Sequence, residues 1–385
     1  MQKLPLKLEK RLRKRKEDNS FRILLPFSNG VDFFSNDYLG FSKSEEIAKN
    51  SLKLTQQSGL LNGSTGSRLL SGNHSLFKIL ENQLSSFHNS QAALVFNSGY
   101  DANLGFFSAV TQKGDIILYD EYSHASIRDG LKMSLANNYK FQHNNIEDLE
   151  SKLKRFSSKE NESEIYIVTE SVFSMDGDMP DLIRIAELAE EYNARLIVDE
   201  AHATGVIGEK GQGLVQKLKL ESKVFARIYT FGKAMGCHGA AILGSNNLKE
   251  YLINFCRSFI YTTALSPHSV ATISAAYRSL EADKHSLEGL KDNIQYFRSE
   301  VQKNSLQNIF IESESAIHAC IIAGNTRVKQ AAEALEDKGF VVKAILSPTV
   351  VSGSERLRFC LHSYNSKHEI SEVLKVLGNF VSNSK

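Results

Sequence analysis

Hydrophobic and polar positions between residues 92 and 243 follow two alternating patterns. Short apolar runs bounded by turn residues predict buried strands at Ala93–Phe96, Ile116–Tyr119, Ile165–Thr169, Leu196–Val198, Ala226–Tyr229 and Ala240–Leu243. Between these runs, apolar residues recur at helical spacing, as Leu149, Leu153 and Phe156 do. Strands that alternate with helices form a mostly parallel sheet covered on both faces, so we expect an α/β fold. Ligands of such a fold bind beyond the carboxyl ends of its strands.

The C-terminal part of the chain has a different pattern. A long helix is expected over Ala271–His285, and beyond it the pattern predicts strands at Ile317–Ile322, Phe340–Ile345 and Arg356–Leu361 and helices at Val328–Lys338 and His368–Val381. These elements indicate a smaller α+β domain. We therefore expect an N-terminal arm of residues 1–45, a large domain of residues 46–285 and a small C-terminal domain of residues 286–385.

Composition and charge narrow the classes of function. The 385 residues are 42% hydrophobic, which suits two cores, and the net charge of +2 supplies no broad field for nucleic acid. No apolar run is long enough to span a bilayer, and the N-terminus lacks the apolar core of a signal peptide. The four cysteines show no paired spacing. We expect a cytoplasmic protein with no nucleic-acid or membrane partner.

The basic residues cluster near the N-terminus, where seven lysines and arginines fall between Lys7 and Lys16. Leu8 and Leu12 are spaced i, i+4, which predicts an amphipathic helix with these leucines on its inner face and a solvated basic face. A nuclear address, a transit peptide or an anion-binding patch is the alternative. Acidic residues such as Glu9 interrupt the charge and favour the solvated helix.

The most informative polar residues follow two of the predicted strands. Lys233 lies in the turn Thr230–Gly236, and Asp199 follows the strand at Leu196–Val198. A lysine in a glycine-flanked turn is a good amine nucleophile, and an aspartate at the end of a neighbouring strand is suited to pair with a cationic ring nitrogen. Pyridoxal phosphate needs both groups, an amine for a Schiff base and an acid that keeps its pyridine protonated. The pair predicts this cofactor and chemistry at an amino-acid α-carbon.

Further residues suit the remaining parts of the same cofactor. Gly99 and Tyr100 open a predicted helix after a strand, where backbone N–H groups bind phosphate, and Thr230 adds a hydroxyl from the other side. His202 and Ser174 are candidate hydrogen-bond donors to the phenolic oxygen of the ring. His124 is a candidate to stack on the ring.

Two other readings of these residues are weaker. Asp199-Glu200-Ala201-His202 spells the DEAH box of nucleic-acid motors, but no phosphate loop of the form G-x-x-x-x-G-K-[ST] lies upstream. Cys237 and His238 are adjacent, and the other cysteines and histidines show no ligand spacing, so no metal site is expected.

Together the motifs resemble those of the α-oxoamine synthases, fold-type I pyridoxal phosphate enzymes that condense an amino acid with an acyl thioester and release carbon dioxide. The matching segments cover nearly the whole chain and include Phe34–Gly40, Gly63–Arg68, Asn97–Tyr100, Ser123–Ala125, Val172–Asp178, Val198–His202, Thr230–Gly236 and Arg356–Arg358. The resemblance implies an aminotransferase-like fold with a large sheet domain and a smaller C-terminal domain.

The resemblance also implies a role for each matched residue. Lys233 is implied to form the Schiff base, and Asp199 to pair with the ring nitrogen. The phosphate is implied to be bound by Gly99, Tyr100 and Thr230. Ser174 and His202 are implied to contact the ring oxygen, and His124 to stack on the ring and face substrate. Arg358 is implied to bind the amino-acid carboxylate, a task suited to a bidentate guanidinium. Thr349 is implied to contact substrate, and Arg22 to lie near the acyl substrate.

Within the family, the motif Thr230–Gly236, the following Gly239–Ala241 and the segment Tyr261–Pro267 favour the branch that joins L-alanine to a pimeloyl thioester in biotin biosynthesis. Sibling synthases that use glycine or serine, and a non-catalytic homologue that binds a partner, are the alternatives. The acyl carrier is either coenzyme A or a carrier protein. Family members are homodimers, so we expect a dimer with Gly63–Arg68 and Tyr261–Thr263 near the neighbouring subunit's cofactor.

Overall fold

The computed structural model describes residues 3–24, 29–60, 62–157 and 163–383, which form two compact units. The large unit consists of Asn36–Ser174 and Met179–Glu288, and the small unit of Met1–Ser35, Met175–Asp178 and Gly289–Lys385. The small unit thus combines residues from both ends of the chain with a four-residue segment from the middle. The three-part division expected from the sequence remains a prediction.

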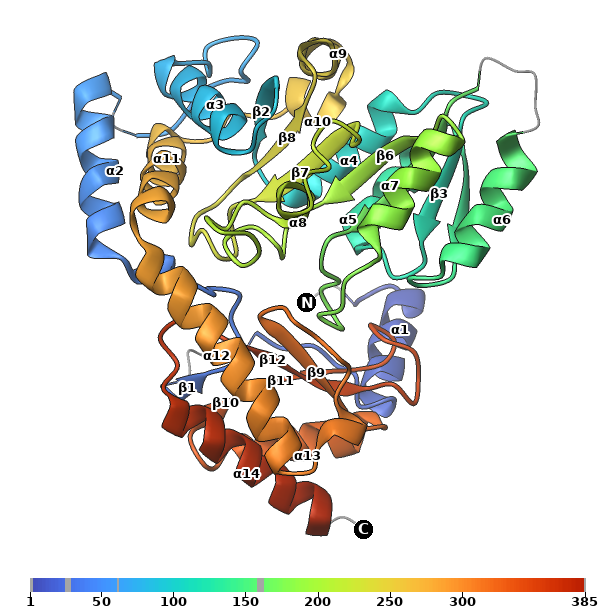
Figure 1. Ribbon diagram of the computed structural model, residues 1–385, viewed down its shortest axis with the longest axis vertical. Helices are drawn as coiled ribbons and strands as arrows, with labels where there is room; N and C mark the ends of the chain where they lie inside the picture. Colours follow the sequence, from blue (N-terminus) through green and yellow to red (C-terminus); the bar gives the residue numbers. More distant parts are fainter. Residues whose placement is uncertain (1–2, 25–28, 61, 158–162, 384–385) are drawn as a thin grey trace. The chain divides into compact units, whose positions relative to one another are not determined.

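A seven-stranded sheet forms the centre of the large unit (Figure 1). Its strands in spatial order are β2 (Ala92–Phe96), β8 (Ala240–Gly244), β7 (Ala226–Thr230), β6 (Arg195–Asp199), β5 (Ile165–Glu170), β3 (Ile116–Asp120) and β4 (Asn137–Phe141). Strand β8 is antiparallel to both of its neighbours, β2 and β7, and the other neighbouring pairs of this sheet are parallel. The expected α/β fold with a mostly parallel sheet is confirmed, and six of the seven strands lie where the apolar runs predict them. The edge strand β4 was missed because four of its five residues are exposed and form no apolar run.

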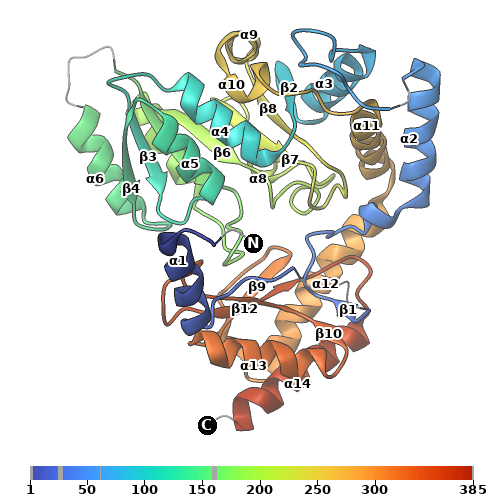
Figure 2. The ribbon, with the colours of Figure 1, turned by 180° about the vertical axis from the view of Figure 1, so that it is seen from behind.

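Helices cover both faces of this sheet. The helices of the large unit are α2 (Glu45–Ser58), α3 (Ser75–Phe87), α4 (Gly99–Val110), α5 (Ala125–Met133), α6 (Ile146–Ser157), α7 (Leu182–Glu191), α8 (Leu214–Lys217), α9 (Asn246–Phe255), α10 (Arg257–Ile260) and α11 (Pro267–Ala282), with a 3₁₀ turn at Phe41–Lys43. Figures 1 and 2 show α4 and α5 on one face and α7 on the other. Phe106 and Phe107 of α4 are fully buried in one cluster with Ile197 and Ile228 of the sheet. This packing fixes α4 over the central strands.

The small unit contains two small sheets. Strand β1 (Val31–Asp32) pairs in parallel with β10 (Phe340–Val341), and β11 (Lys343–Ile345), β12 (Arg356–Cys360) and β9 (Ile317–Ile321) form an antiparallel sheet in that order. Its helices are α1 (Leu6–Glu17), α13 (Asn325–Glu336), α14 (Lys367–Asn383) and most of α12 (Lys284–Lys303). The single strand expected over Phe340–Ile345 is divided between the two sheets.

Two helices differ from their sequence predictions. The helix at the N-terminus is present as α1, but its expected inner face is wrong, because Leu8 and Leu12 are 45% and 47% exposed and no residue of α1 is buried. The single helix expected over Ala271–His285 is also wrong, since it is interrupted at Asp283. The Asp283 carboxylate accepts the His285 N–H and the Ser286 hydroxyl and so begins the new helix α12.

No helix in the described part of the chain is long and apolar enough to cross a membrane.

Candidate active site

Three parallel neighbours of the large sheet end on polar residues of the candidate site. Strand β5 ends at Glu170, β6 at Asp199 and β7 at Thr230, and Glu170 and Asp199 are register partners. The carboxyl ends of these strands therefore gather the three side chains at one edge of the sheet. Lys233 follows Thr230 by three residues, and His124 follows the end of β3 by four.

The turn that carries Lys233 is closed by its own backbone. The Phe231 N–H donates to Gly239 O at 2.9 Å, the Gly236 N–H to Lys233 O at 2.8 Å and the Cys237 N–H to Phe231 O at 2.7 Å. Gly236 has a φ of 60°, and a Cβ there would lie 2.2 Å from Ser42 N, so the turn needs glycine both for its conformation and for its packing. The half-buried Lys233 is thus held on a fixed backbone.

The first turn of α4 and Thr230 form a cradle that fits a phosphate group. Ser98 caps α4, so the N–H groups at the start of the helix lie where an anion binds well. A Cβ on Gly99 would lie 2.3 Å from Thr230 Cγ2, which shows how closely this helix end meets β7. The buried Thr230 hydroxyl has no hydrogen-bond partner among the described residues. The Tyr100 phenol donates to Asp129 at 2.7 Å, so its backbone N–H is the group suited to the phosphate.

Asp199 is a buried carboxylate held by two donors. The Ala201 N–H donates to Asp199 Oδ1 at 2.9 Å, and Asn103 Nδ2 on α4 donates to Asp199 Oδ2 at the same distance. His202 is also buried, and its Nδ1 lies 2.8 Å from the Tyr38 hydroxyl. Ser174 is half-buried in the segment after β5. The carboxylate is therefore anchored and suited to hold a cationic ring nitrogen.

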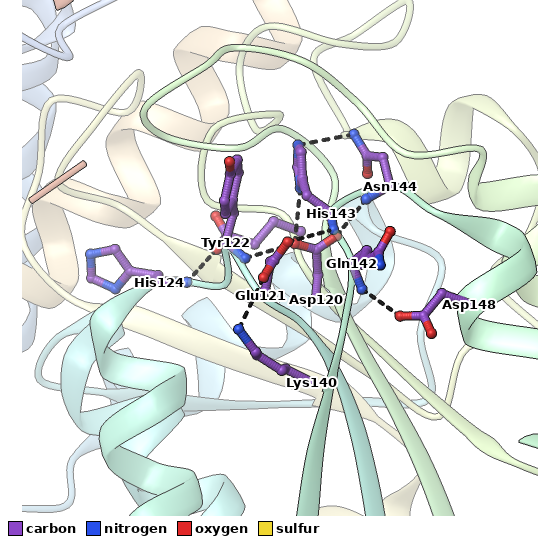
Figure 3. A network of polar contacts seen from close by, with 10 residues as sticks. Asp120, Glu121, Tyr122, His124, Lys140, Gln142, His143, Asn144 and Asp148 are labelled. Carbon is purple, nitrogen blue, oxygen red and sulfur yellow. Dashed lines mark hydrogen bonds and ion pairs between the residues drawn. The ribbon is translucent and has the colours of Figure 1, made fainter. Parts of the chain in front are cut away.

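The loop that carries His124 is clamped by the fully buried Asp120, as Figure 3 shows. The Asp120 carboxylate accepts the backbone N–H groups of Tyr122 and Asn144 at 2.8 and 2.9 Å, and His143 Nδ1 lies 2.9 Å from it. The His143 ring stacks on the Tyr122 ring. These contacts fix the entry into α5, whose N-cap is His124.

Charged groups in this part of the large unit shift one another's pKa values. Burial and, to a smaller extent, the nearby Asp199 raise the pKa of the Glu170 carboxyl to about 8, against the opposing effect of Lys233. The His124 ring has accessible surface, yet enough protein surrounds it that desolvation lowers its pKa, and Lys233 lowers that pKa further. The Glu170 Oε1 atom accepts the His124 N–H at 2.6 Å. The site thus combines two carboxyl groups, a neutral imidazole and one amine. This combination is suited to a ligand that contains a positively charged ring.

The raised pKa of Glu170 predicts a pH-dependent stability of the cofactor-free protein. Between the ordinary value of 4.5 and about 8, the folded chain binds a proton at Glu170 that the unfolded chain has released. The free energy of unfolding should therefore fall as pH rises through this window. We expect Glu170→Gln to flatten that slope in urea titrations from pH 5 to pH 8.

The exposed Glu187 of α7 provides the control for this measurement. Glu187→Gln should reproduce the wild-type slope, because this side chain lies at the surface of α7 and away from Glu170 in the sequence. A Glu170→Gln protein that retains the full wild-type slope would show that Glu170 is ionised in the folded chain.

The expected substrate residues lie in the small unit. Arg358 is buried on β12, and its Nη1 lies 2.9 Å from Cys360 Sγ. Arg356, two residues earlier, forms a buried ion pair with Asp176. The first arginine of the motif is therefore a structural residue, which leaves Arg358 as the candidate to bind substrate. Arg22 and Thr349 are exposed and in contact, with Arg22 Nη2 3.4 Å from Thr349 Oγ1.

The structure thus divides the predicted residues into two sets. The large unit holds the cofactor set, Gly99, Tyr100, His124, Ser174, Asp199, His202, Thr230 and Lys233, and the small unit holds Arg22, Thr349 and Arg358. Sequence reasoning missed Asn103, Glu170 and Tyr38, which contact members of the cofactor set. A signal for Asn103 was available, because it is a polar residue on the otherwise apolar buried side of α4.

Comparisons with known proteins show the family to which the chain belongs. The family model for class I and II aminotransferases matches residues 28–377. An 8-amino-7-oxononanoate synthase from Emericella nidulans is 39% identical over 390 residues, a match that covers 96% of this chain and 94% of the relative.

Solved structures extend the similarity to the fold. A Sphingomonas wittichii serine palmitoyltransferase superposes with a TM-score of 0.90 at 26% identity, covering 100% of this chain and 99% of the other. An 8-amino-7-oxononanoate synthase from Francisella tularensis gives a TM-score of 0.78 at 28% identity, covering 92% and 99%. The expected aminotransferase-like fold and the expected cofactor are both confirmed. The chain therefore belongs to the class I and II aminotransferase family of pyridoxal phosphate-dependent enzymes, and within it to the α-oxoamine synthases.

Proposed function

We propose that the protein joins L-alanine to a pimeloyl thioester, with release of carbon dioxide, to give 8-amino-7-oxononanoate in biotin biosynthesis. The observation that carries this proposal is the 39% identity, over almost the full length of both chains, to a relative named for that reaction. The segments near Lys233 that favour the alanine-using branch support it.

The residues of the large unit suit the steps that such a reaction needs. Pyridoxal phosphate, when bound, supplies an electron sink for negative charge at the amino-acid α-carbon. Lys233 would bind the cofactor through its amine and, as a free amine, would act as the general base that takes the α-proton. Asp199, anchored by Asn103 and the Ala201 N–H, would hold the ring nitrogen in its protonated form. Gly99 and Thr230 would hold the phosphate, and His124 would cover one face of the ring.

Charged residues of the small unit suit the two carboxylates of the substrates. Arg358 is proposed to bind the alanine carboxylate through its guanidinium, with Thr349 as a further contact. Arg22 is proposed to bind the distal carboxylate of the pimeloyl chain. Its contact with Thr349 places two of the three proposed substrate residues side by side.

The two arginines should affect different kinetic constants. We expect Arg358→Ala to weaken alanine binding whichever thioester is supplied, and Arg22→Ala to raise KM for the pimeloyl donor while alanine binding is nearly unchanged. Loss of a hydrogen bond to a charged group corresponds to about 1.5–3 kcal/mol in each case. Steady-state assays of thiol release, with each substrate varied in turn, measure both effects.

Arg298, a half-buried residue of the same unit that pairs with Glu314, is the matched control. Arg298→Ala should leave both KM values unchanged. If Arg22→Ala leaves the donor KM unchanged, another cation must bind the distal carboxylate. If the wild-type enzyme works equally well with an acyl chain that lacks a terminal acid, the pimeloyl assignment fails.

A sibling activity is the second candidate, because a solved serine palmitoyltransferase superposes with a TM-score of 0.90. A serine palmitoyltransferase-like enzyme would use serine, and a 2-amino-3-ketobutyrate CoA ligase would use glycine. Absorbance spectra recorded while alanine, glycine and serine are added in turn separate these activities. A clear preference for glycine or serine would move the chain to the corresponding branch, and a chain with no cofactor band would be a non-catalytic homologue.

We further propose that the enzyme is a cytoplasmic homodimer. Large apolar side chains are exposed close to the two segments expected at the subunit boundary, namely Leu69, Leu70 and Tyr261, which are 50%, 81% and 73% exposed. Large apolar side chains that are exposed near such segments are typical of an interface. No disulfide joins the four cysteines, all of which the structure describes, and this pattern is typical of proteins of a reducing compartment.

A further inference from the structure

A chain of three hydrogen bonds, two buried and one part-buried, joins the residue expected at the ring nitrogen to the residue expected over the ring face. Asn103 Nδ2 lies 2.9 Å from Asp199 Oδ2 and 3.1 Å from Ser126 Oγ. Ser126 Oγ in turn lies 2.7 Å from His124 Nδ1. Asn103 and Ser126 are 2% and 1% exposed, so the two hydrogen bonds that Asn103 donates are shielded from water.

The direction of each hydrogen bond follows from the chemistry of its partners. The Asn103 amide must present its NH₂ group to Asp199, because its oxygen would meet a carboxylate oxygen there. The two protons of that NH₂ group serve two acceptors, Asp199 and the Ser126 hydroxyl. Because Ser126 Oγ accepts from Asn103, its own proton is available to His124 Nδ1. The Ser126 backbone N–H also donates to this nitrogen, at 3.2 Å.

His124 Nδ1 is therefore an acceptor, and the neutral ring carries its proton on Nε2. Charged groups around the ring, Lys233, Asp199, Arg128 and Asp129, act on its ionisation from neighbouring segments. The two donors to Nδ1 add to the stability of the neutral form. Asn103 thus sets the hydroxyl direction that in turn sets the tautomer of His124.

Stability alone does not account for an asparagine at position 103. The remaining amide oxygen, Asn103 Oδ1, is buried and has no hydrogen-bond partner among the described residues. An unpartnered buried carbonyl is unfavourable. The neighbouring buried positions of α4, among them Ala102, Phe106 and Phe107, are apolar. An asparagine at this position is explained by the two protons of its NH₂ group, which it donates to Asp199 and Ser126.

We propose that Asn103 and Ser126 are positioning residues, which hold Asp199 and His124 as one hydrogen-bonded unit around the pyridine ring of the cofactor. The proposal rests on the proposed roles of Asp199 and His124 as contacts of that ring. Neither Asn103 nor Ser126 touches the reacting atoms. Their effect is to fix the carboxylate that faces the ring nitrogen and the imidazole that covers the ring.

The test uses protein that contains no substrate, so that it does not depend on which amino acid or thioester is used. The pKa of His124 is measured in the cofactor-free chain by NMR with ¹⁵N-labelled histidine, and its signal is identified by its loss in His124→Asn. We expect Asn103→Ala and Ser126→Ala each to raise this pKa by about half a unit or more, because each weakens donation to the neutral Nδ1.

The second readout is the affinity for pyridoxal phosphate, titrated into the same proteins and followed by absorbance. We expect Asn103→Ala to raise the dissociation constant about tenfold, the size expected for one lost hydrogen bond to a charged group. The double variant Asn103→Ala/Ser126→Ala should cost less affinity than the two single changes added together, because residues of one chain act as a unit.

Asn293 supplies the matched control, since it is a buried asparagine of the small unit whose Nδ2 also serves two acceptors, His362 O and Asn365 O. Asn293→Ala should lower stability and change neither readout. Wild-type values in both Asn103→Ala and Ser126→Ala would overturn the proposal, as would equal shifts in Asn293→Ala. If the shifts appear while alanine and pimeloyl thioester are not turned over, the positioning proposal holds and the substrate assignment fails.

Discussion

Lys233→Ala is expected to reduce turnover by at least about four orders of magnitude, because the proposed mechanism uses one amine both as the covalent anchor of the cofactor and as the base that removes the α-proton. The backbone of its turn is closed by three hydrogen bonds and does not depend on the lysine side chain. The variant should therefore fold and still bind pyridoxal phosphate non-covalently through the cradle at Gly99 and Thr230. Its absorbance band should then no longer resemble that of the wild-type enzyme.

Two measurements check the assignment of Lys233. Borohydride reduction of the wild-type enzyme should attach the mass of the cofactor to the peptide that contains Lys233, and added methylamine should restore part of the activity of Lys233→Ala. The exposed Lys217 of α8 is the control, and Lys217→Ala should keep full activity. Labelling of a different lysine by borohydride would refute the assignment.

Asp199→Asn is expected to lower turnover by roughly two orders of magnitude or more, about 3 kcal/mol of lost charge stabilisation. The amide keeps the shape of the carboxylate but does not hold a proton on the ring nitrogen. The enzyme should retain the cofactor, so the loss should appear in kcat. Rapid-mixing kinetics of α-proton exchange with alanine alone would show the same loss.

The neighbouring Glu200 is a suitable control for Asp199, since it is also a buried carboxyl group but accepts hydrogen bonds from backbone N–H groups. Its oxygens accept the N–H groups of Leu214 and Val215 at 2.9 and 2.7 Å. Glu200→Gln should lower the melting temperature and leave α-proton exchange per folded molecule close to wild type. Near-normal exchange in Asp199→Asn would remove Asp199 from the mechanism.

The sequence predicted the central sheet well because its strands are buried on both faces and therefore appear as apolar runs. The sequence pattern did not predict elements that are mostly exposed, or helix ends that depend on a side chain bonded to backbone N–H groups. Strand β4 is mostly exposed and carries no apolar signal. The break between α11 and α12 depends on Asp283 as a cap, which hydrophobic periodicity does not detect.

The candidate site was predictable to a similar degree. Lys233, Asp199 and Thr230 follow predicted strands, so the position of strand ends was enough to bring them together. Asn103 and Glu170 come from elements whose relation to Asp199 depends on how α4 crosses the sheet and on which strands pair. Helix crossing and strand pairing are properties of the folded chain, so the sequence pattern could not predict these two residues.

The composition of the small unit has a consequence for how the protein is made. Strand β1 near the start of the chain pairs with β10, about 300 residues later. At a typical synthesis rate of about 5–20 residues per second, β1 leaves the ribosome roughly 15–60 s before its partner exists. The large unit, by contrast, is complete by Glu288. Folding during translation should therefore proceed from the middle of the chain outward, and the small unit should be the last part to form.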